Sequence, residues 1–177
     1  MEKVPTFNEF IKMLQSDMAR VVTAHSANAL EGADVVRRFD KLTPYAVHPV
    51  WCAMTIMQEP KLSPQLRYTG ARVLLFHDFK EDTRAQLPAD ITAEEECLID
   101  AMTFNDLNHE MEEIWSREKL VWLLKLYDKT SNVADGSWMT KDRRKQVVDY
   151  VLHLANAVEE RWGSLNIGRF SRALCAT

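Results

Sequence analysis

Cysteine is scarce in this sequence, and its spacing excludes both a thiolate metal cage and a disulfide framework. The three cysteines, Cys52, Cys97 and Cys175, are far apart, and no two of them form a Cys-x-x-Cys pair. A structural zinc site needs closely spaced ligands, and a small disulfide-rich domain needs paired cysteines. The pattern is typical of reduced thiols, so we expect a cytoplasmic protein, or one in the host cytoplasm if a virus encodes it.

Long apolar runs and an excess of charge of either sign are also missing. No stretch approaches the ~20 apolar residues that a membrane helix needs. The first residues, 1–5, lack the basic and apolar segments of a signal peptide, so we expect none. The 22 Lys and Arg residues against 26 Asp and Glu residues give a net charge of −4 without a basic tract. We therefore expect neither nucleic acid nor a membrane as a partner.

Strand signals are absent, whereas helix signals recur along the whole chain. Capping boxes stand at Thr6-x-x-Glu9 and Thr92-x-x-Glu95, and Ser63 precedes a proline suited to a first helical turn. The apolar content of 46% suffices for one well-packed core, so we expect a single all-α domain over residues 1–177. The spacing predicts helices over residues 6–22, 64–76, 92–102, 116–133, 141–162 and 164–174, with loops near 31–47, 83–91, 104–115 and 134–140.

The segment 74–83 gathers acid–base groups directly after an apolar run. On a continuous helix His77 and Glu81 lie one turn apart, as do Asp78 and Asp82, so all four share one patch. A solvated helix end is the simplest interpretation of a lone His-Asp pair. Three carboxylates crowded beside a histidine repel one another unless a cation is present, which favours a metal site.

A second polar group interrupts the apolar helix expected around residues 122–132. Asp128 and Asn132 share one face of it, with Lys125 one turn earlier. An exposed Asp128 is the alternative, because a buried carboxylate without a partner is costly. His48 directly precedes a proline, which predicts a position at a helix entrance from which its ring can reach another helix. One ion explains these features together, and the predicted ligands are His48, His77, Asp78 and Asp128.

Two imidazoles and two carboxylates suit a borderline divalent ion such as Mn, Fe, Co or Zn. Four protein ligands on a six-coordinate ion leave positions for water and substrate. Such an ion lowers the pKa of water and polarises a phosphoryl oxygen. Glu81 or Asp82 would orient that water and move its proton. The residues therefore predict an enzyme, a metal-dependent phosphohydrolase.

At these residues the chain resembles the HD phosphohydrolase superfamily, whose pattern is His … His-Asp … Asp. More narrowly, it resembles the hydrolase domain of the Rel/SpoT alarmone enzymes and the small alarmone hydrolases, over residues 5–175. The resemblance implies a compact multi-helix HD-domain bundle with the metal site in its centre. The matching segments are Tyr45-x-x-His48-Pro49, Leu74-Leu75-x-His77-Asp78-x-x-Glu81-Asp82-Thr83 and Lys125-Leu126-x-Asp128-x-x-x-Asn132.

The resemblance also implies roles and a substrate. The ion is usually manganese, Glu81 and Asp82 form the catalytic acid–base pair, and the substrate is a small nucleotide. Members of this kind remove the 3′-pyrophosphate from guanosine tetra- and pentaphosphate, and some small relatives act on other nucleotides, including nicotinamide phosphates. The predicted substrate contacts are Asn132, Lys125, Lys129, Arg38, Phe39 and Lys41.

The chain departs from the family in its substrate elements. Phe39 and Asp40 stand where an Arg-Lys pair usually precedes the ligand histidine. Phe39 can still stack on a base, but Asp40 repels phosphate, and Arg37, Arg38 or Lys41 would have to compensate. After Asp128 the family usually has Arg-Leu-His-Asn, and here the histidine is lost, since the residues are Lys129, Thr130, Ser131 and Asn132.

Three functions stay open on this basis. The first is alarmone hydrolysis, favoured by Glu81, Asp82 and Asn132. The second is hydrolysis of a deoxynucleoside phosphate or triphosphate or of a nicotinamide dinucleotide phosphate, favoured by Phe39 and Asp40. The third is a nucleotide-binding module without turnover, although all four predicted ligands are retained.

Two further features are open to interpretation. His25, at the end of the first expected helix, is predicted to be a surface group. An apolar stripe on the long C-terminal helix fits either the core or a contact between copies of the chain, so a homo-oligomer remains open. The stripe consists of Val147, Val151, Leu154 and Val158.

Overall fold

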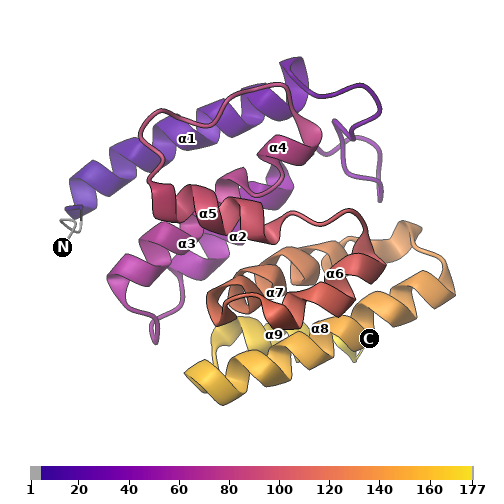
Figure 1. Cartoon of the computed structure of the whole chain (residues 1–177). Coiled ribbons are helices and arrows are strands. Elements are labelled where there is room, and N and C mark those ends of the chain that lie inside the picture. The colour runs from indigo at the N-terminus through magenta and orange to yellow at the C-terminus, as the bar shows by residue number, and fades with distance from the viewer. Residues whose placement is uncertain (1–4, 177) are drawn as a thin grey trace.

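The computed structural model describes residues 5–176, which fold into nine α-helices and two short 3₁₀ helices (Figure 1). No strand forms among these residues, and none of their helices is both long and apolar enough to cross a membrane. The expected domain 1–177 also includes residues 1–4 and 177, which lie outside the described residues. The helices are α1 (Phe7–Ala27), α2 (Val47–Met57), α3 (Pro64–Phe76), α4 (Phe79–Asp82), α5 (Ala93–Met102), α6 (Leu107–Glu113), η1 (Ile114–Ser116), α7 (Lys119–Ala134), η2 (Gly136–Trp138), α8 (Lys141–Trp162) and α9 (Asn166–Cys175).

Helix α7 is the central element of the bundle. It contacts α2, α3, α5, α8 and α9, and in Figure 1 it lies between α1 on one side and α8 and α9 on the other. Its apolar side chains are buried around most of the helix, and each contributes about 1.5–3 kcal/mol to folding. A polar residue on this helix is therefore surrounded by core. The fully buried members are Val121, Leu123, Leu124, Leu126 and Tyr127.

The apolar stripe of α8 belongs to the core. Val147, Val151, Leu154 and Val158 are at most 4% exposed within the single chain. Helix α8 packs against α7 and α9, and these contacts cover the stripe. The alternative of a contact between copies through this stripe is therefore wrong.

Buried charged side chains form ion pairs and hydrogen bonds between helices. Arg72 on α3 donates to Asp17 on α1 and to Glu95 on α5, at 2.9 and 3.1 Å. Glu59, 1% exposed, accepts a hydrogen bond from the backbone amide of Asn166 at 2.7 Å. Its negative charge thereby balances the partial positive charge at the N-terminus of α9. Because an unpaired buried charge is costly, these pairs fix how the helices pack.

Most helices lie where the spacing predicts them, and both predicted capping boxes are formed. The segment 104–115, expected to be a loop, instead contains α6 and η1. The reason is local, since the side chain of Asp106 accepts the amide of His109 and caps α6. The helix expected over residues 116–133 begins later than predicted, because Ser116 ends η1 and α7 begins at Lys119.

Gly70 allows α3 to approach α2 and α7 closely. A Cβ atom at this position would lie 2.6 Å from Cδ1 of Ile56 and 3.3 Å from Cδ2 of Leu124, and both neighbours are fully buried. We expect Gly70→Ala to lower the free energy of unfolding by about 1–3 kcal/mol through overpacking, measured by urea denaturation.

Gly168 on α9 provides the matched control. A Cβ there meets only Nη1 of Arg172, at the ordinary distance of 3.6 Å. Because alanine favours a helix over glycine, Gly168→Ala should leave stability unchanged or raise it by up to about 1 kcal/mol. Equal losses at the two positions would contradict the close approach as the cause.

Candidate metal centre

Three segments converge on one point inside the bundle. His48 is the second residue of α2, as expected for a helix entrance, and Asp128 lies on the central helix α7. His77 and Asp78 lie between the end of α3 and the start of α4, where Asp78 has φ −92° and ψ 1°. The segment is therefore not the continuous helix that the spacing predicted, because the backbone breaks at the His-Asp pair.

The convergence brings possible metal ligands together. His48, His77 and Asp128, all buried, each place one ligand atom within 4.8 Å of the other two. Oδ1 of Asp128 lies 3.3 Å from Nε2 of His48 and 3.8 Å from Nε2 of His77. Asp78 stands beside this group, with its carboxylate oxygens 3.1 Å from Nε2 of His77 and 3.6 Å from Nε2 of His48.

The partners of the two imidazoles fit metal binding. Nδ1 of His77 lies 2.8 Å from the carbonyl oxygen of Leu74, which only accepts, so Nδ1 carries a proton and Nε2 of the neutral ring keeps its lone pair. Among the described residues this buried Nε2 has no hydrogen-bond partner. Nδ1 of His48 is likewise engaged, by Oγ of Ser131 at 2.9 Å. The Nε2 lone pairs of the two imidazoles face carboxylate oxygens, and a cation between the rings and the carboxylates would be attracted by both. The group can therefore hold a divalent metal ion.

The charges around this group are strongly coupled. Burial alone would lower the pKa of His77, but the negative charges of Asp78 and Asp128 raise it to about 9. At neutral pH, without a metal ion, Nε2 therefore carries a proton, and a divalent ion would take the place of that proton. Burial would raise the pKa of Asp128, but Lys129 and Lys125 hold it well below its usual range. Asp128 is therefore an ionised carboxylate in the core, as a cation ligand must be.

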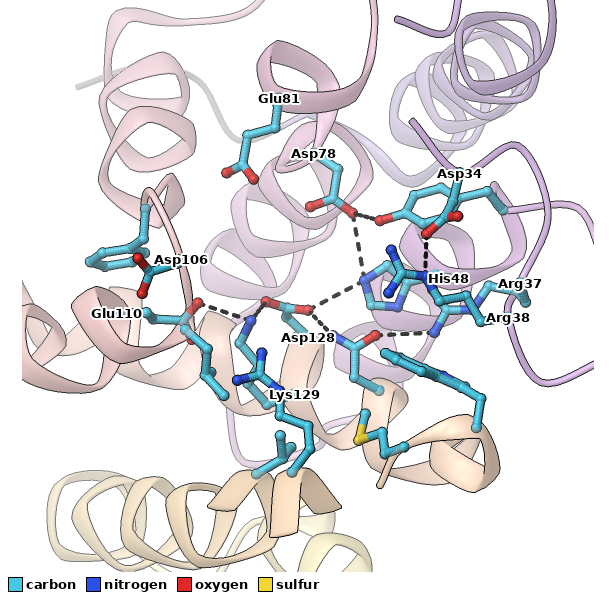
Figure 2. A pocket seen from close by; sticks show the side chains of 18 of the residues that line it. Asp34, Arg37, Arg38, His48, Asp78, Glu81, Asp106, Glu110, Asp128 and Lys129 are labelled. Carbon is cyan, nitrogen blue, oxygen red and sulfur yellow. Dashed lines mark hydrogen bonds and ion pairs between the residues drawn. The ribbon is translucent and has the colours of Figure 1, made fainter. Parts of the chain in front are cut away.

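Glu81 and Asp82 lie on α4, next to Asp78. Burial of the Glu81 carboxyl group and the charge of Asp78 raise its pKa to about 7, although the residue also reaches solvent at the rim. The same two causes raise the pKa of Asp82 to about 6. Glu81 lines the pocket and points into it in Figure 2, whereas Asp82 is not among the lining residues.

A pocket of about 320 Å³ extends from the metal group toward solvent, a volume in the range of small-ligand sites. Arg37 and Arg38 line it, and each already has a carboxylate partner (Figure 2). Nε of Arg37 lies 2.5 Å from Asp135, and Nε of Arg38 lies 2.6 Å from Asp34. Arg38 also stacks on the indole of Trp138, with 4.8 Å between the guanidinium carbon and the ring centroid.

The structure brings only some of the predicted substrate contacts to this pocket. Phe39 is 42% exposed and Lys41 has a φ of 57°, and neither lines the pocket. Asp40 accepts the backbone amide of Thr43 at 3.0 Å and closes the exposed turn, so it does not repel phosphate in the pocket. The predicted contacts that do line the pocket are Asn132, Lys125, Lys129 and Arg38.

Three side chains that support the site were not singled out from the sequence. The hydroxyl of Tyr45 donates to Asp78 at 2.7 Å, and Ser131 contacts His48 as described. Ser131 stands where the family usually has histidine, so this departure still provides a partner for a possible ligand. Glu110 contacts Lys129 at 2.9 Å from a segment that was expected to be a loop. Tyr45 lies in one of the segments that match the family, and this is the signal that could have identified it. For Glu110 the only sequence signal is the residue that caps α6, because it indicates a helix there and not a loop.

The prediction that His25 is a surface group is wrong. Its side chain is 2% exposed, in the last turn of α1. Its ring centroid lies 5.0 Å from that of Tyr45 and 6.1 Å from that of Phe79. Helix α1 packs against α4, and this contact buries the ring and lowers its pKa.

Comparisons with known proteins support the fold. No family model matches this chain, and no curated protein matches its sequence. Among solved structures, the chain is similar to one described as a metazoan ortholog of SpoT that hydrolyzes ppGpp and plays a role in starvation responses. The TM-score is 0.65 at 17% sequence identity, over 98% of this chain and 96% of that chain. The expected all-α HD-domain fold is therefore confirmed.

Because the ligand atoms of His48, His77 and Asp128 lie close together, we expect a divalent cation, with Mn²⁺ as the probe, to raise the melting temperature of the metal-stripped protein. A ligand that binds only the folded state contributes about 2.7 kcal/mol at 100 times its Kd. His77→Ala removes an imidazole whose Nε2 has no other partner, so most of this shift should disappear. The measurement is thermal unfolding with and without Mn²⁺. His153→Ala, at an exposed position on α8, should keep the full shift, and a full shift in His77→Ala would contradict the assignment.

Proposed function

We propose that this protein is a metal-dependent nucleotide phosphohydrolase that removes the 3′-pyrophosphate from guanosine tetra- or pentaphosphate. The observation that carries the proposal is the group formed by His48, His77 and Asp128, whose ligand atoms lie within 4.8 Å of one another at the inner end of a pocket. The fold shared with a protein described as hydrolysing ppGpp supports the same class of reaction.

In this proposal His48, His77, Asp78 and Asp128 hold one divalent ion. Manganese is the first choice, and iron, cobalt and zinc suit the same nitrogen and oxygen ligands. When bound, such an ion supplies Lewis-acid chemistry, since it polarises a phosphoryl oxygen and lowers the pKa of water. Asp78 is kept in place for this role by the hydroxyl of Tyr45, at 2.7 Å.

The acid–base role falls to the carboxylates of α4. Glu81 lines the pocket, so its carboxylate can accept a proton from the water that attacks phosphorus and return a proton to the leaving oxygen. Asp82 is proposed as the second member of the pair, although it does not line the pocket. Glu81 is therefore the side chain on which turnover depends more strongly.

Substrate binding is proposed for the polar groups on the other walls. Lys125 and Lys129 on α7 place positive charge beside the inner end of the pocket, and Arg38 offers a cation at its mouth. Asn132 donates to Oδ1 of Asp128 at 2.9 Å, and the second hydrogen of its amide can serve a substrate oxygen. The phosphate groups of a substrate would therefore bind most favourably near these side chains.

The pairing of the two arginines favours a second candidate substrate. Arg37 binds Asp135 and Arg38 binds Asp34, so fewer cations are free for a substrate with as many phosphates as guanosine tetra- or pentaphosphate. A less charged nucleotide fits this balance better. The candidates are a deoxynucleoside phosphate or triphosphate and a nicotinamide dinucleotide phosphate, and a binding module without turnover is the remaining alternative.

The deciding experiment incubates the metal-stripped protein and Mn²⁺ with a substrate panel and resolves the products by ion-exchange chromatography. The panel contains guanosine tetraphosphate, the deoxynucleoside triphosphates, nucleoside monophosphates and nicotinamide adenine dinucleotide phosphate. Pyrophosphate released only from the tetraphosphate supports the alarmone reaction. Cleavage of another compound supports the second candidate. If no compound is cleaved, the result supports a nucleotide-binding module without turnover.

Two substitutions test the ligand set. Asp78→Ala and Asp128→Asn should each lower turnover by about 100-fold or more while the far-ultraviolet circular dichroism stays helical. Asparagine is chosen at position 128 because alanine would leave the ammonium groups of Lys125 and Lys129 short of a partner. Asp149→Ala, which removes an exposed partner of Lys145, is the control and should keep normal turnover. Near-normal activity of either site variant contradicts the metal assignment.

A further inference from the structure

We infer that Glu110 is a positioning residue of the metal centre, which acts through Lys125 and Lys129 to keep Asp128 oriented toward a divalent cation. The inference rests on the proposed metal-dependent function. It assigns a role to a residue outside both the proposed ligand set and the proposed substrate contacts.

Glu110, Lys125, Lys129 and Asp128 form one network of alternating charge. Nζ of Lys125 lies 3.1 Å from Oδ2 of Asp128 and 3.3 Å from Oε2 of Glu110. Nζ of Lys129 lies 3.2 Å and 2.9 Å from the same two oxygens. Both ammonium groups therefore bridge one oxygen of Asp128 and one oxygen of Glu110. Glu110 lies to the left of Asp128 in Figure 2.

The network is mostly buried in the wall of the pocket, so solvent screens its charges only weakly. The side chains of Asp128, Glu110 and Lys125 are 4–5% exposed, and that of Lys129 is 14% exposed. Charges at this depth act on one another far more strongly than on the protein surface.

The network also separates the two oxygens of Asp128. Oδ2 faces the two lysines, whereas Oδ1 faces the imidazole of His48 at 3.3 Å and that of His77 at 3.8 Å. The amide of Asn132 also donates to Oδ1, at 2.9 Å. The lysines therefore hold the carboxylate in the rotation that turns Oδ1 toward the proposed ligand histidines.

Glu110 is needed because two ammonium groups beside a ligand oppose the binding of a cation. With Glu110 ionised, two positive and two negative charges balance in the network. Without its charge, one positive charge is in excess next to the proposed ion and repels it. The lysines would also lose the acceptor that fixes them on the far side of Asp128, so the carboxylate would be held less firmly.

The competing explanation is that Glu110 only neutralises buried lysines and so stabilises the fold. That explanation predicts a lower melting temperature for Glu110→Gln with an unchanged affinity for metal. The positioning role predicts a lower affinity, and the two are separated by a binding measurement on the folded variant.

The test is the Kd of the full chain for Mn²⁺, measured by electron paramagnetic resonance of free Mn²⁺ after metal removal. We expect Glu110→Gln to raise this Kd by about 10-fold to 100-fold. Glu95→Gln is the matched control, since it removes another buried carboxylate, the partner of Arg72 at 3.1 Å, that does not line the pocket. It should lower the melting temperature and keep the Kd of the wild type.

A charge-balanced variant adds a rescue. Glu110→Gln combined with Lys129→Met removes one charge of each sign, so most of the lost Mn²⁺ affinity should return, which a purely structural role does not predict. If Glu110→Gln does not fold, Glu110→Asp takes its place, because it keeps the charge but draws it away from the lysines, and its Kd should rise as well.

The outcomes distinguish this inference from the proposed function. A wild-type Kd in the folded Glu110 variants overturns the positioning role and leaves the metal centre intact. A wild type that binds no Mn²⁺ overturns the metal centre, and the positioning role with it. A raised Kd at Glu110 with an unchanged Kd at Glu95 supports the positioning role.

Discussion

The buried carboxylate of Asp128 is the constraint on which the rest of this structure depends. It lies on the most deeply packed helix, 3% exposed, where an unpaired charge would cost several kcal/mol. Its partners come from three directions: His48 from α2, His77 from the break between α3 and α4, and Lys125 and Lys129 from its own helix. The packing of α2 and α3 on α7 therefore also brings the two histidines to Asp128.

The inner and outer halves of the pocket are built differently as a result. The inner half stands on helices and at helix ends, whose positions are fixed by core packing such as the close approach at Gly70. The outer half includes the turn around residues 34–43, which carries both pocket arginines and is stabilised by local contacts of Asp40. A change in the exposed part of the turn, away from Arg37, alters what the mouth of the pocket binds and leaves the ligand geometry untouched.

The sequence predicts the helices and the inner site well because both depend on local signals. Caps and apolar spacing locate most helices, and the proposed ligands His48, His77 and Asp128 do meet. The burial of His25 and the network around Glu110 depend on which helix faces which, and periodicity carries no such information. Lys41 does not line the pocket, and it has a positive φ, a backbone conformation that lysine rarely adopts and that the sequence does not predict.

The two pocket arginines are not equivalent, although both are paired. The side chains of Arg38 and Asp34 are 56% and 38% exposed, so their ion pair contributes little and is easily exchanged for another anion. Those of Arg37 and Asp135 are 8% and 19% exposed, so breaking this pair would leave a charge without a partner in a largely dry site. Arg37 also donates to Asn132, which in turn donates to Asp128, so it belongs to the support of the inner site. The cation that a substrate can recruit at the mouth is therefore Arg38, and its stacking on Trp138 orients it for a planar or anionic group.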